Sequence, residues 1–356
     1  MAVNPRGRQQ PSTLYMIAAE TGVSPSTVSR VINAKNESEA RRWASAATIR
    51  RVLDTAAEHN YQPNPQAVSL RKRRSNFIGM VVPRLQDYVL ATIHEGVDEA
   101  ATDLGYATFA ANSLDDRVKQ RRAVELLRSR RVQGIIFGDA FFDGEFLEEV
   151  KHQGVKFTLV SRRVPGYPSV TCNDELGGRM AGSHLAELGR SRVGILAGQP
   201  YASTSIDRTH GLVTALQEAG IEVPTHRIVH GPFDAQGGRE ATEKLLAQGP
   251  PYPDAIFAAN DFGAIGAMGA LRDKHLRVPD DVALIGFNDT ALAAELPTPL
   301  TSVRSPMHQM GREGLQMLLR VLEGEDPEPV QLTPTLIIRE STVGPDTTSE
   351  EGSGLA

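Results

Sequence analysis

From residue 76 onward, short apolar runs alternate with helical segments, and this alternation constrains the fold more than any other feature. Near-continuous apolar runs are typical of strands in parallel sheets whose two faces are covered by helices. We therefore expect an α/β region, and the number of strands requires two sheets. The expected strands cover residues 77–82, 107–110, 134–137, 157–160, 193–196, 255–258 and 282–286. The expected helices cover residues 91–104, 117–130, 145–153, 175–188, 206–218, 237–247 and 262–274.

Residues 13–33, T-L-Y-M-I-A-A-E-T-G-V-S-P-S-T-V-S-R-V-I-N, predict two short helices around a tight turn. We expect Thr13 to cap the first helix, which begins at Leu14. Gly22 can adopt a positive φ and so end that helix. We expect Ser24 to cap the second helix, with Pro25 at its first position, where a missing N–H has no cost.

The second helix would have one apolar and one polar face. Val28, Val31 and Ile32 would pack against the first helix. A helix-turn-helix of this kind can place its second helix in the major groove of DNA. Many helical hairpins also have a glycine in the turn, so the pattern alone favours DNA binding without excluding a hairpin that binds no DNA. The polar side chains left outside are Ser26, Thr27, Ser29, Arg30 and Asn33.

Charge is divided unevenly along the chain. Residues 1–75 contain 12 Lys and Arg against 5 Asp and Glu, a net charge of +7, whereas residues 76–356 carry −12. A basic head on an acidic body is typical of a modular DNA-binding protein. Cys172 is the only cysteine, which favours a reducing compartment. Because we find neither a signal region nor an apolar run of about 20 residues, we expect a cytoplasmic protein without a membrane span.

The phrase V-S-x-x-T-V-S-R-V-I-N closely resembles the DNA-binding module of the lactose-repressor (LacI/GalR) family of bacterial transcription regulators. A-N-D-x-x-A-x-G-A, at residues 259–267, and R-E-S-T, at residues 339–342, extend the resemblance over nearly the whole chain. The resemblance implies an all-α helix-turn-helix head followed by a two-lobed α/β domain like that of periplasmic binding proteins. Cys172 departs from the family, which often has Asp there.

The resemblance also implies domain boundaries and a hinge. Asn64 can cap a short hinge helix, in which Leu70 would occupy the position that intercalates between base pairs. The expected parts are a DNA-binding domain at 1–61 with a flexible arm at 1–12, a hinge helix and linker at 62–75, an effector-binding and dimerisation domain at 76–346, and a flexible tail at 347–356. Lobe one would comprise about 76–172 and 305–331, and lobe two about 173–304 and 332–346. The expected DNA contacts are Thr13, Leu14, Ser24, Pro25, Ser26, Thr27, Ser29, Arg30, Asn33, Asn64, Ala67 and Leu70.

Residues 34–44 form a longer connection than is usual in that family, and they contain the only tryptophan, Trp43. We favour a tolerated loop insertion. The alternative is an extra contact to DNA or a partner through Arg41, Arg42 and Trp43. Ser45 is then expected to cap a further helix that closes the head. Its expected apolar stripe is Ile49, Val52, Leu53 and Ala56.

The chain contains no P-loop, H-E-x-x-H or G-x-S-x-G motif and no cysteine cluster, so we expect no enzyme activity, metal or cofactor. Ligands of open α/β folds bind beyond the carboxyl ends of strands, where several polar residues fall. Carboxylates, amides, an arginine and an aromatic ring suit a sugar or similar polyol. Each residue alone could instead be a helix cap, as Asn260 would be. The expected effector-binding residues are Asp87, Tyr88, Ser161, Thr204, Arg208, Phe233, Asn260 and Asn288.

Two alternatives stay open beside an effector-controlled repressor. One is a solute-binding protein for a transporter, which the missing signal region and the basic head disfavour. The other is an enzyme on the same two-lobed scaffold. The sequence leaves open the effector, the operator, the regulated genes and whether the effector releases or recruits the protein. With the resemblance, it predicts a homodimeric, sequence-specific repressor that binds near-palindromic operator DNA and a small-molecule effector.

Overall fold

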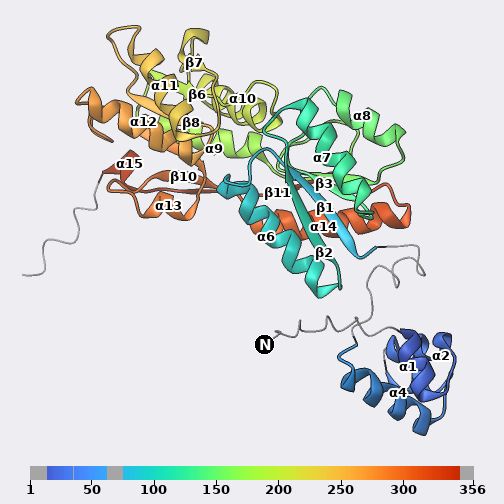
Figure 1. Ribbon diagram of the computed structural model, residues 1–356. Coiled ribbons are helices and arrows are strands. Elements are labelled where there is room, and N and C mark those ends of the chain that lie inside the picture. The colour runs from blue at the N-terminus through green and yellow to red at the C-terminus, as the bar shows by residue number, and fades with distance from the viewer. Residues whose placement is uncertain (1–13, 35, 62–74, 345–356) are drawn as a thin grey trace, which may run out of the picture. The chain divides into compact units, whose positions relative to one another are not determined.

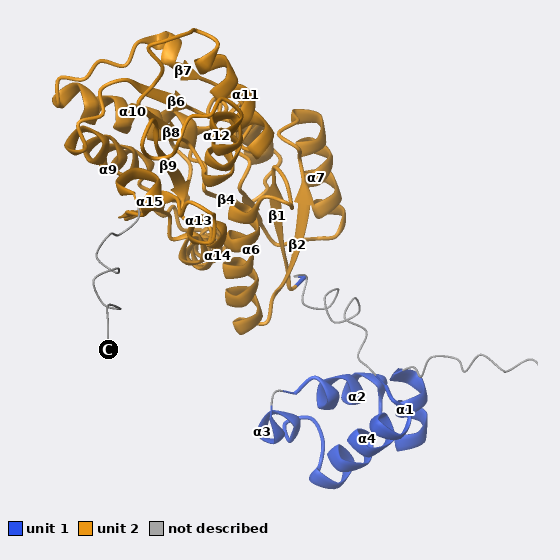
Figure 2. Cartoon of the chain, turned by 90° about the vertical axis from the view of Figure 1, so that its left-hand side faces the viewer, with its two compact units in different colours: residues 1–75 blue, residues 76–356 orange. Residues whose placement is uncertain are grey.

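The computed structural model describes residues 14–34, 36–61 and 75–344 of the 356-residue chain. The chain divides into two compact units, residues 1–75 and 76–356, which we call the head and the body (Figure 2). Several expected features lie outside the described residues: Thr13, Asn64, Ala67, Leu70, the N-terminal arm, the hinge helix and the C-terminal tail.

The described part of the head is helical, and both expected caps are present. The side chain of Ser24 accepts a hydrogen bond from the Thr27 N–H at 3.2 Å, and that of Ser45 accepts one from the Thr48 N–H at 3.3 Å. Gly22 has a φ of +64°, which permits the tight turn. The helices are α1 (Leu14–Thr21), α2 (Pro25–Ile32), α3 (Glu37–Ala40) and α4 (Ala46–Glu58).

A small apolar core holds these helices together. Two expectations for this region are wrong. Leu53 is 46% exposed rather than part of the apolar stripe, because it lies one residue, or about 100°, beyond Val52 around the helix. Residues 34–44 contain α3 rather than only a loop, and Ala40 of α3 is buried. The core residues are Ile17, Ala18, Val28, Val31, Ala40, Ile49, Val52 and Ala56.

The body contains two six-stranded sheets, which define lobe one and lobe two. All strand pairs of the described chain are parallel apart from β10 with β12. Lobe one has the order β11 (Val330–Leu332), β5 (Ser169–Cys172), β4 (Phe157–Val160), β3 (Ile135–Phe137), β1 (Phe77–Val82), β2 (Ala107–Asn112). Lobe two has the order β12 (Thr335–Ile337), β10 (Thr301–Arg304), β9 (Ala283–Asn288), β8 (Ala255–Ala258), β6 (Val193–Leu196), β7 (Ile228–Val229).

Helices cover both faces of each sheet (Figure 1). In lobe one, α6 (Tyr88–Asp103) and α14 (Met307–Glu323) pack on one face, and α7 (Arg117–Ser129) and α8 (Glu145–His152) on the other. In lobe two, α9 (Asp174–Glu187) and α10 (Ser203–Glu218) form one pair, and α11 (Ala235–Leu246) and α12 (Asp261–Asp273) the other. Shorter helices are η1 (Thr225–Arg227), α13 (Ala291–Ala294) and α15 (Glu340–Val343).

Each expected strand is present, within a few residues at its ends, but five strands, β5, β7, β10, β11 and β12, and the long helix α14 were not among the expected elements. Strand β10 is buried although it contains Thr301 and Ser302, because tertiary hydrogen bonds satisfy their hydroxyls. Thr301 Oγ1 donates to the Arg339 carbonyl at 2.9 Å, and Ser302 Oγ donates to Asp261 Oδ1 at 2.5 Å. Helix α14 follows Pro306, which provides no side-chain cap that would mark its start. No helix in the described ranges is long and apolar enough to span a bilayer.

Candidate functional site

Helix α2 buries Val28 and Val31 and exposes a polar face. Ser26, Arg30 and Asn33 are exposed on it, while Thr27 and Ser29 are half-buried. Part of this face also maintains the helix. Ser24 is the N-cap, its Oγ lies 2.8 Å from Ser26 Oγ, and the Asn33 side chain donates to the Ser29 carbonyl at 2.7 Å. Pro25 opens the helix, and half-buried Leu14 packs against the core of the head.

Arg30 is the only basic residue in the last turn of α2. Its Cζ lies 3.9 Å from the centroid of the Trp43 ring, over the face of the indole. Trp43, from the connection at residues 34–44, therefore lies beside Arg30 on the surface of α2 that is expected to contact DNA.

In lobe one, polar side chains gather where the strands end. Asp87, Asp115, Asp139 and Arg162 follow β1, β2, β3 and β4 respectively. The Arg162 guanidinium pairs with Asp115 through two hydrogen bonds of 2.7 and 3.2 Å. It also lies 5.7 Å from the Tyr201 ring of lobe two. Because parallel strands end at one edge, this cluster lies where lobe one meets lobe two.

Asp139 is the least satisfied member of this cluster. Its side chain is fully buried, and neither carboxylate oxygen has a hydrogen-bond partner among the described residues. Burial raises its pKa to about 6, while the nearby Ser113 hydroxyl, the Gln120 amide and the Arg162 charge oppose that rise. The Ser113 hydroxyl donates to the Val82 carbonyl and the Gln120 amide to the Asp139 backbone carbonyl, so neither bonds the carboxylate itself. Oε1 of Gln120, also buried, likewise has no partner there. A buried acceptor without a donor is costly, so this position favours a ligand that donates hydrogen bonds.

In lobe two, Arg208 is held by its own lobe. Its Nε donates to Asp174 Oδ1 at 2.7 Å, one Nη to the Ala259 carbonyl at 2.6 Å, and the other Nη lies 3.4 Å from Asn288 Oδ1. Its Cζ stacks 3.7 Å from the Phe287 ring centroid. Burial raises the pKa of Asp174 to about 6, although the Arg208 charge opposes this. The Arg208 guanidinium is therefore positioned by residues of lobe two.

Close packing of α9 against α10 makes this network possible. A β-carbon added at Gly211 would lie 2.0 Å from the Glu175 carbonyl oxygen, and one at Gly178 would lie 2.2 Å from that of Arg208. Only glycine permits this approach, which brings Asp174 at the start of α9 to Arg208 in α10.

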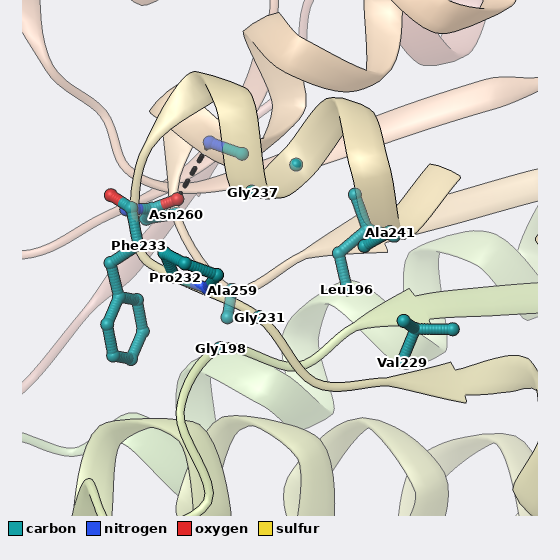
Figure 3. Close-up of a pocket in the computed structure, with 12 residues that line it drawn as sticks. Leu196, Gly198, Val229, Gly231, Pro232, Phe233, Gly237, Ala241, Ala259 and Asn260 are labelled. Carbon is teal, nitrogen blue, oxygen red and sulfur yellow. Dashed lines mark hydrogen bonds between the residues drawn. The ribbon is translucent and has the colours of Figure 1, made fainter. Parts of the chain in front are cut away.

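Asn260 is the N-cap of α12, one of the two roles considered for it from the sequence. Its Oδ1 accepts from the Gly263 N–H at 2.8 Å and its Nδ2 donates to the Phe233 carbonyl at 2.8 Å. Figure 3 shows it beside Phe233 at a small recess, whose other lining includes the apolar Leu196 and Val229. That recess has little polar lining for a polyol.

The other residues expected to bind the effector also follow strands, but some of their side chains are buried and others are exposed. Asp87 caps α6 through the Val89 N–H at 3.0 Å, and burial raises its pKa. Tyr88 is exposed, and Thr204 is buried in the first turn of α10. Ser161 has a φ of +64°, and its N–H points to the Met310 sulfur at 3.2 Å.

The effector-binding residues expected from the sequence do not include Asp115, Asp139, Asp174 or Tyr201. Asp139 lies two residues beyond an expected strand, so the rule that selected Asp87 would have found it. No group of three metal-binding side chains gathers anywhere in residues 14–34, 36–61 and 75–344.

Direct contacts join the two lobes beside this cluster. Arg163 of lobe one pairs with Asp207 of lobe two through bonds of 2.8 and 2.7 Å, and its N–H donates to Ser203 Oγ at 2.8 Å. The rings of Phe141 and Tyr201 stack with centroids 4.6 Å apart. Any opening of the lobes along this edge would break these contacts.

The two units match two known families. Residues 13–64 match the family of bacterial regulatory proteins, lacI family, and residues 183–342 match the periplasmic binding protein-like domain. The HTH-type transcriptional regulator DegA of Bacillus subtilis is 31% identical over 338 residues, covering 93% of this chain and 98% of DegA. The HTH-type transcriptional repressor PurR of Photobacterium profundum is 30% identical over 335 residues, with the same coverage.

Solved structures resemble the chain over similar lengths. The lac repressor dimer bound to operator and the anti-inducer ONPF has a TM-score of 0.83 at 27% identity, covering 94% of this chain and 100% of that one. The complex of the transcriptional regulator CelR with cellobiose has a TM-score of 0.70 at 31% identity, covering 93% and 99%.

Proposed function

Because the chain belongs to the lacI family of bacterial regulatory proteins, we propose that it is a transcriptional repressor whose operator affinity is set by a small neutral effector bound between its lobes. Its relatives are helix-turn-helix regulators, which favours a regulator over a solute-binding protein without a transcriptional role. The proposal includes a cytoplasmic location, where operator DNA lies, and no catalytic activity.

The polar face of α2 supports the DNA-binding part of the proposal. Because α2 buries Val28 and Val31 in the core of the head, Ser26 and Arg30 face outward and can reach base edges in a major groove. We assign base contacts to Ser26, Thr27 and Arg30. Pro25 has no N–H and can contribute only apolar or steric selectivity. Asn64, Ala67 and Leu70 are proposed to contact the central minor groove, with Leu70 as the apolar wedge.

A dimer is proposed because one head offers few base contacts. Two heads related by a two-fold axis would read a near-palindromic operator with two half-sites. The similar lac repressor structure is a dimer bound to operator. Sedimentation of the full chain with operator DNA should give two chains per duplex. One chain bound tightly to a single half-site would contradict the dimer.

The chemistry of the lobe-one cluster supports a neutral effector. Asp87, Asp115 and Asp139 surround a single buried arginine, Arg162, so an anionic ligand would meet an excess of carboxylates. Hydroxyl groups would instead donate to the unpartnered oxygens of Asp139. The rings of Tyr201 and Phe233, 5.7 and 5.9 Å from the Arg162 Cζ, add apolar faces of the kind that pack against sugar rings. A sugar or sugar derivative fits this set, and the similar CelR structure contains cellobiose.

A comparison of matched ligands tests this assignment. We would titrate the protein–operator complex with neutral mono- and disaccharides and with the corresponding sugar phosphates and uronic acids. A neutral sugar should change operator affinity, and Asp139→Leu should abolish that response while operator binding persists. A response to anionic members alone, or an unchanged response in Asp139→Leu, would contradict the assignment.

A further inference from the structure

Trp43 and Arg30 form a stacked pair on the surface of the head. Trp43 is the only tryptophan of the chain, and its side chain is 47% exposed. The guanidinium carbon of Arg30 lies 3.9 Å from the indole centroid, a distance typical of a cation–π stack. No carboxylate of the described residues pairs with Arg30, so this stack is its principal side-chain contact.

The core of the head fixes the position of Trp43. Helix α3 begins at a side-chain cap, since Asn36 Oδ1 accepts from the Glu39 N–H at 2.9 Å. Its last residue, Ala40, is buried among the core residues. The Ala40 carbonyl accepts hydrogen bonds from the N–H groups of Trp43 at 3.0 Å and Ala44 at 3.3 Å. The indole is therefore presented by a structured segment that is anchored in the core.

We propose that Trp43 is a positioning residue, which holds the Arg30 guanidinium in the orientation needed to read a base. The proposal rests on the base contact assigned to Arg30 above. An arginine reads guanine through the in-plane N–H groups at the edge of its guanidinium. Stacking uses the flat face of that group instead, so the N–H donors stay free while the side chain is held.

The size of the effect follows from the exposure of the pair. A long, flexible arginine must be ordered when it binds a base, and a preformed stack supplies part of that order beforehand. An exposed cation–π pair corresponds to about a two- to fivefold change in an equilibrium constant. Loss of the indole should therefore weaken operator binding by about this factor, and only through the base that Arg30 reads.

A direct contact of Trp43 with DNA predicts a different result. An indole that packs against sugar or phosphate would strengthen binding to every sequence, independently of Arg30. The two mechanisms therefore differ in base specificity and in their dependence on Arg30.

The experiment uses the full-length chain and a duplex that the wild-type protein enriches from a random DNA pool. Affinity is measured for that duplex and for duplexes with each half-site base replaced in turn. The variants are Trp43→Ala, Trp43→Phe, Trp43→Leu, Arg30→Ala and the double variant Arg30→Ala/Trp43→Ala. Trp43→Leu retains apolar bulk but has no aromatic face, and circular dichroism checks that each variant is folded.

We expect Trp43→Ala and Trp43→Leu to bind the selected duplex about two- to fivefold more weakly, with discrimination reduced at the base where Arg30→Ala loses it. Trp43→Phe should retain most of the affinity, and the double variant should match Arg30→Ala. Additive losses in the double variant, or equal weakening of Trp43→Ala on every duplex, would overturn the positioning role. If Arg30→Ala shows no base-specific loss, or no duplex is enriched, the assigned base contact itself fails.

Discussion

The head and the body present the side chains proposed for function in opposite ways. On α2 of the head, Ser26 and Arg30 are exposed, and a separate set of apolar residues forms the core. In the body, Arg208 and Asp139 are buried at the ends of the sheets, within the packed structure itself. The exposed residues proposed to read bases are thus distinct from the apolar core in the head, whereas in the body the residues proposed for function belong to the buried structure. Substitutions in the body should therefore change stability more than substitutions on the α2 face.

The largest effect is expected for Arg208→Ala. This substitution removes the arginine that is hydrogen-bonded to Asp174 and leaves a buried carboxyl without its direct charge partner. Loss of one partner of a buried pair typically costs about 3–5 kcal/mol of unfolding free energy. Denaturant unfolding of the body, followed by circular dichroism, measures it. Arg277→Ala is the matched control, because that arginine pairs with Asp281 at the exposed surface and should matter far less. Equal losses of unfolding free energy in the two variants would contradict the idea that the buried Arg208 matters more for stability than a surface arginine.

Asp139→Asn should instead stabilise the body at neutral pH. Asp139 has a pKa of about 6 when folded, against an ordinary value of 3.8 for a free side chain, so the native state holds the proton more tightly. The contribution of this group to the free energy of unfolding is thus fully present below pH 3.8. It is lost as the pH rises from there through about 6, by up to about 3 kcal/mol in total.

The asparagine removes that loss, since it cannot ionise. We expect Asp139→Asn to gain about 1–3 kcal/mol at pH 7.5, with the gain shrinking as pH falls toward 4. Thermal or urea unfolding at the two pH values measures the difference. A gain that is the same at both values would show that ionisation of Asp139 is not its cause.

Ser24→Ala should have a smaller effect, confined to the head. It removes the acceptor for the Thr27 N–H at the start of α2, and a lost N-cap typically costs about 1 kcal/mol. Fluorescence of Trp43, the only tryptophan, reports unfolding of the head alone. Ser38→Ala, at an exposed position of α3 in the same head, is the control and should change stability by less than about 0.5 kcal/mol. Similar losses for both serines would show that the lost cap at Ser24 is not the cause.

The same contrast explains what could be predicted from the sequence. The turn at Gly22 and the caps Ser24 and Ser45 were predictable because their contacts lie within a few residues. In the body, the rule that ligands bind beyond strand ends selected Arg208 and Asn288. It could not predict that Arg208 is hydrogen-bonded to Asp174, which is 34 positions away. Strand β10 was missed for a similar reason, since tertiary partners make Thr301 and Ser302 suitable for a buried strand.

The connection after α2 gives the clearest correction. Residues 34–44 looked like a tolerated insertion, because nothing local connects Trp43 to Arg30, which lies 13 positions earlier. Packing of Ala40 in the core brings the two side chains together. Contacts of this kind follow from the three-dimensional arrangement of the helices and carry no periodic signal in the sequence.

The central claim is that the head reads DNA sequence through α2, and selection from a random DNA pool tests it most directly. Wild-type protein should enrich a near-palindromic site. Arg30→Ala should lose preference at one base position in each half-site, worth about 1–3 kcal/mol of discrimination, while its head unfolds at the same denaturant concentration. Failure to enrich any sequence, or an Arg30→Ala variant that enriches the same site with the same preference at every base, would contradict the account.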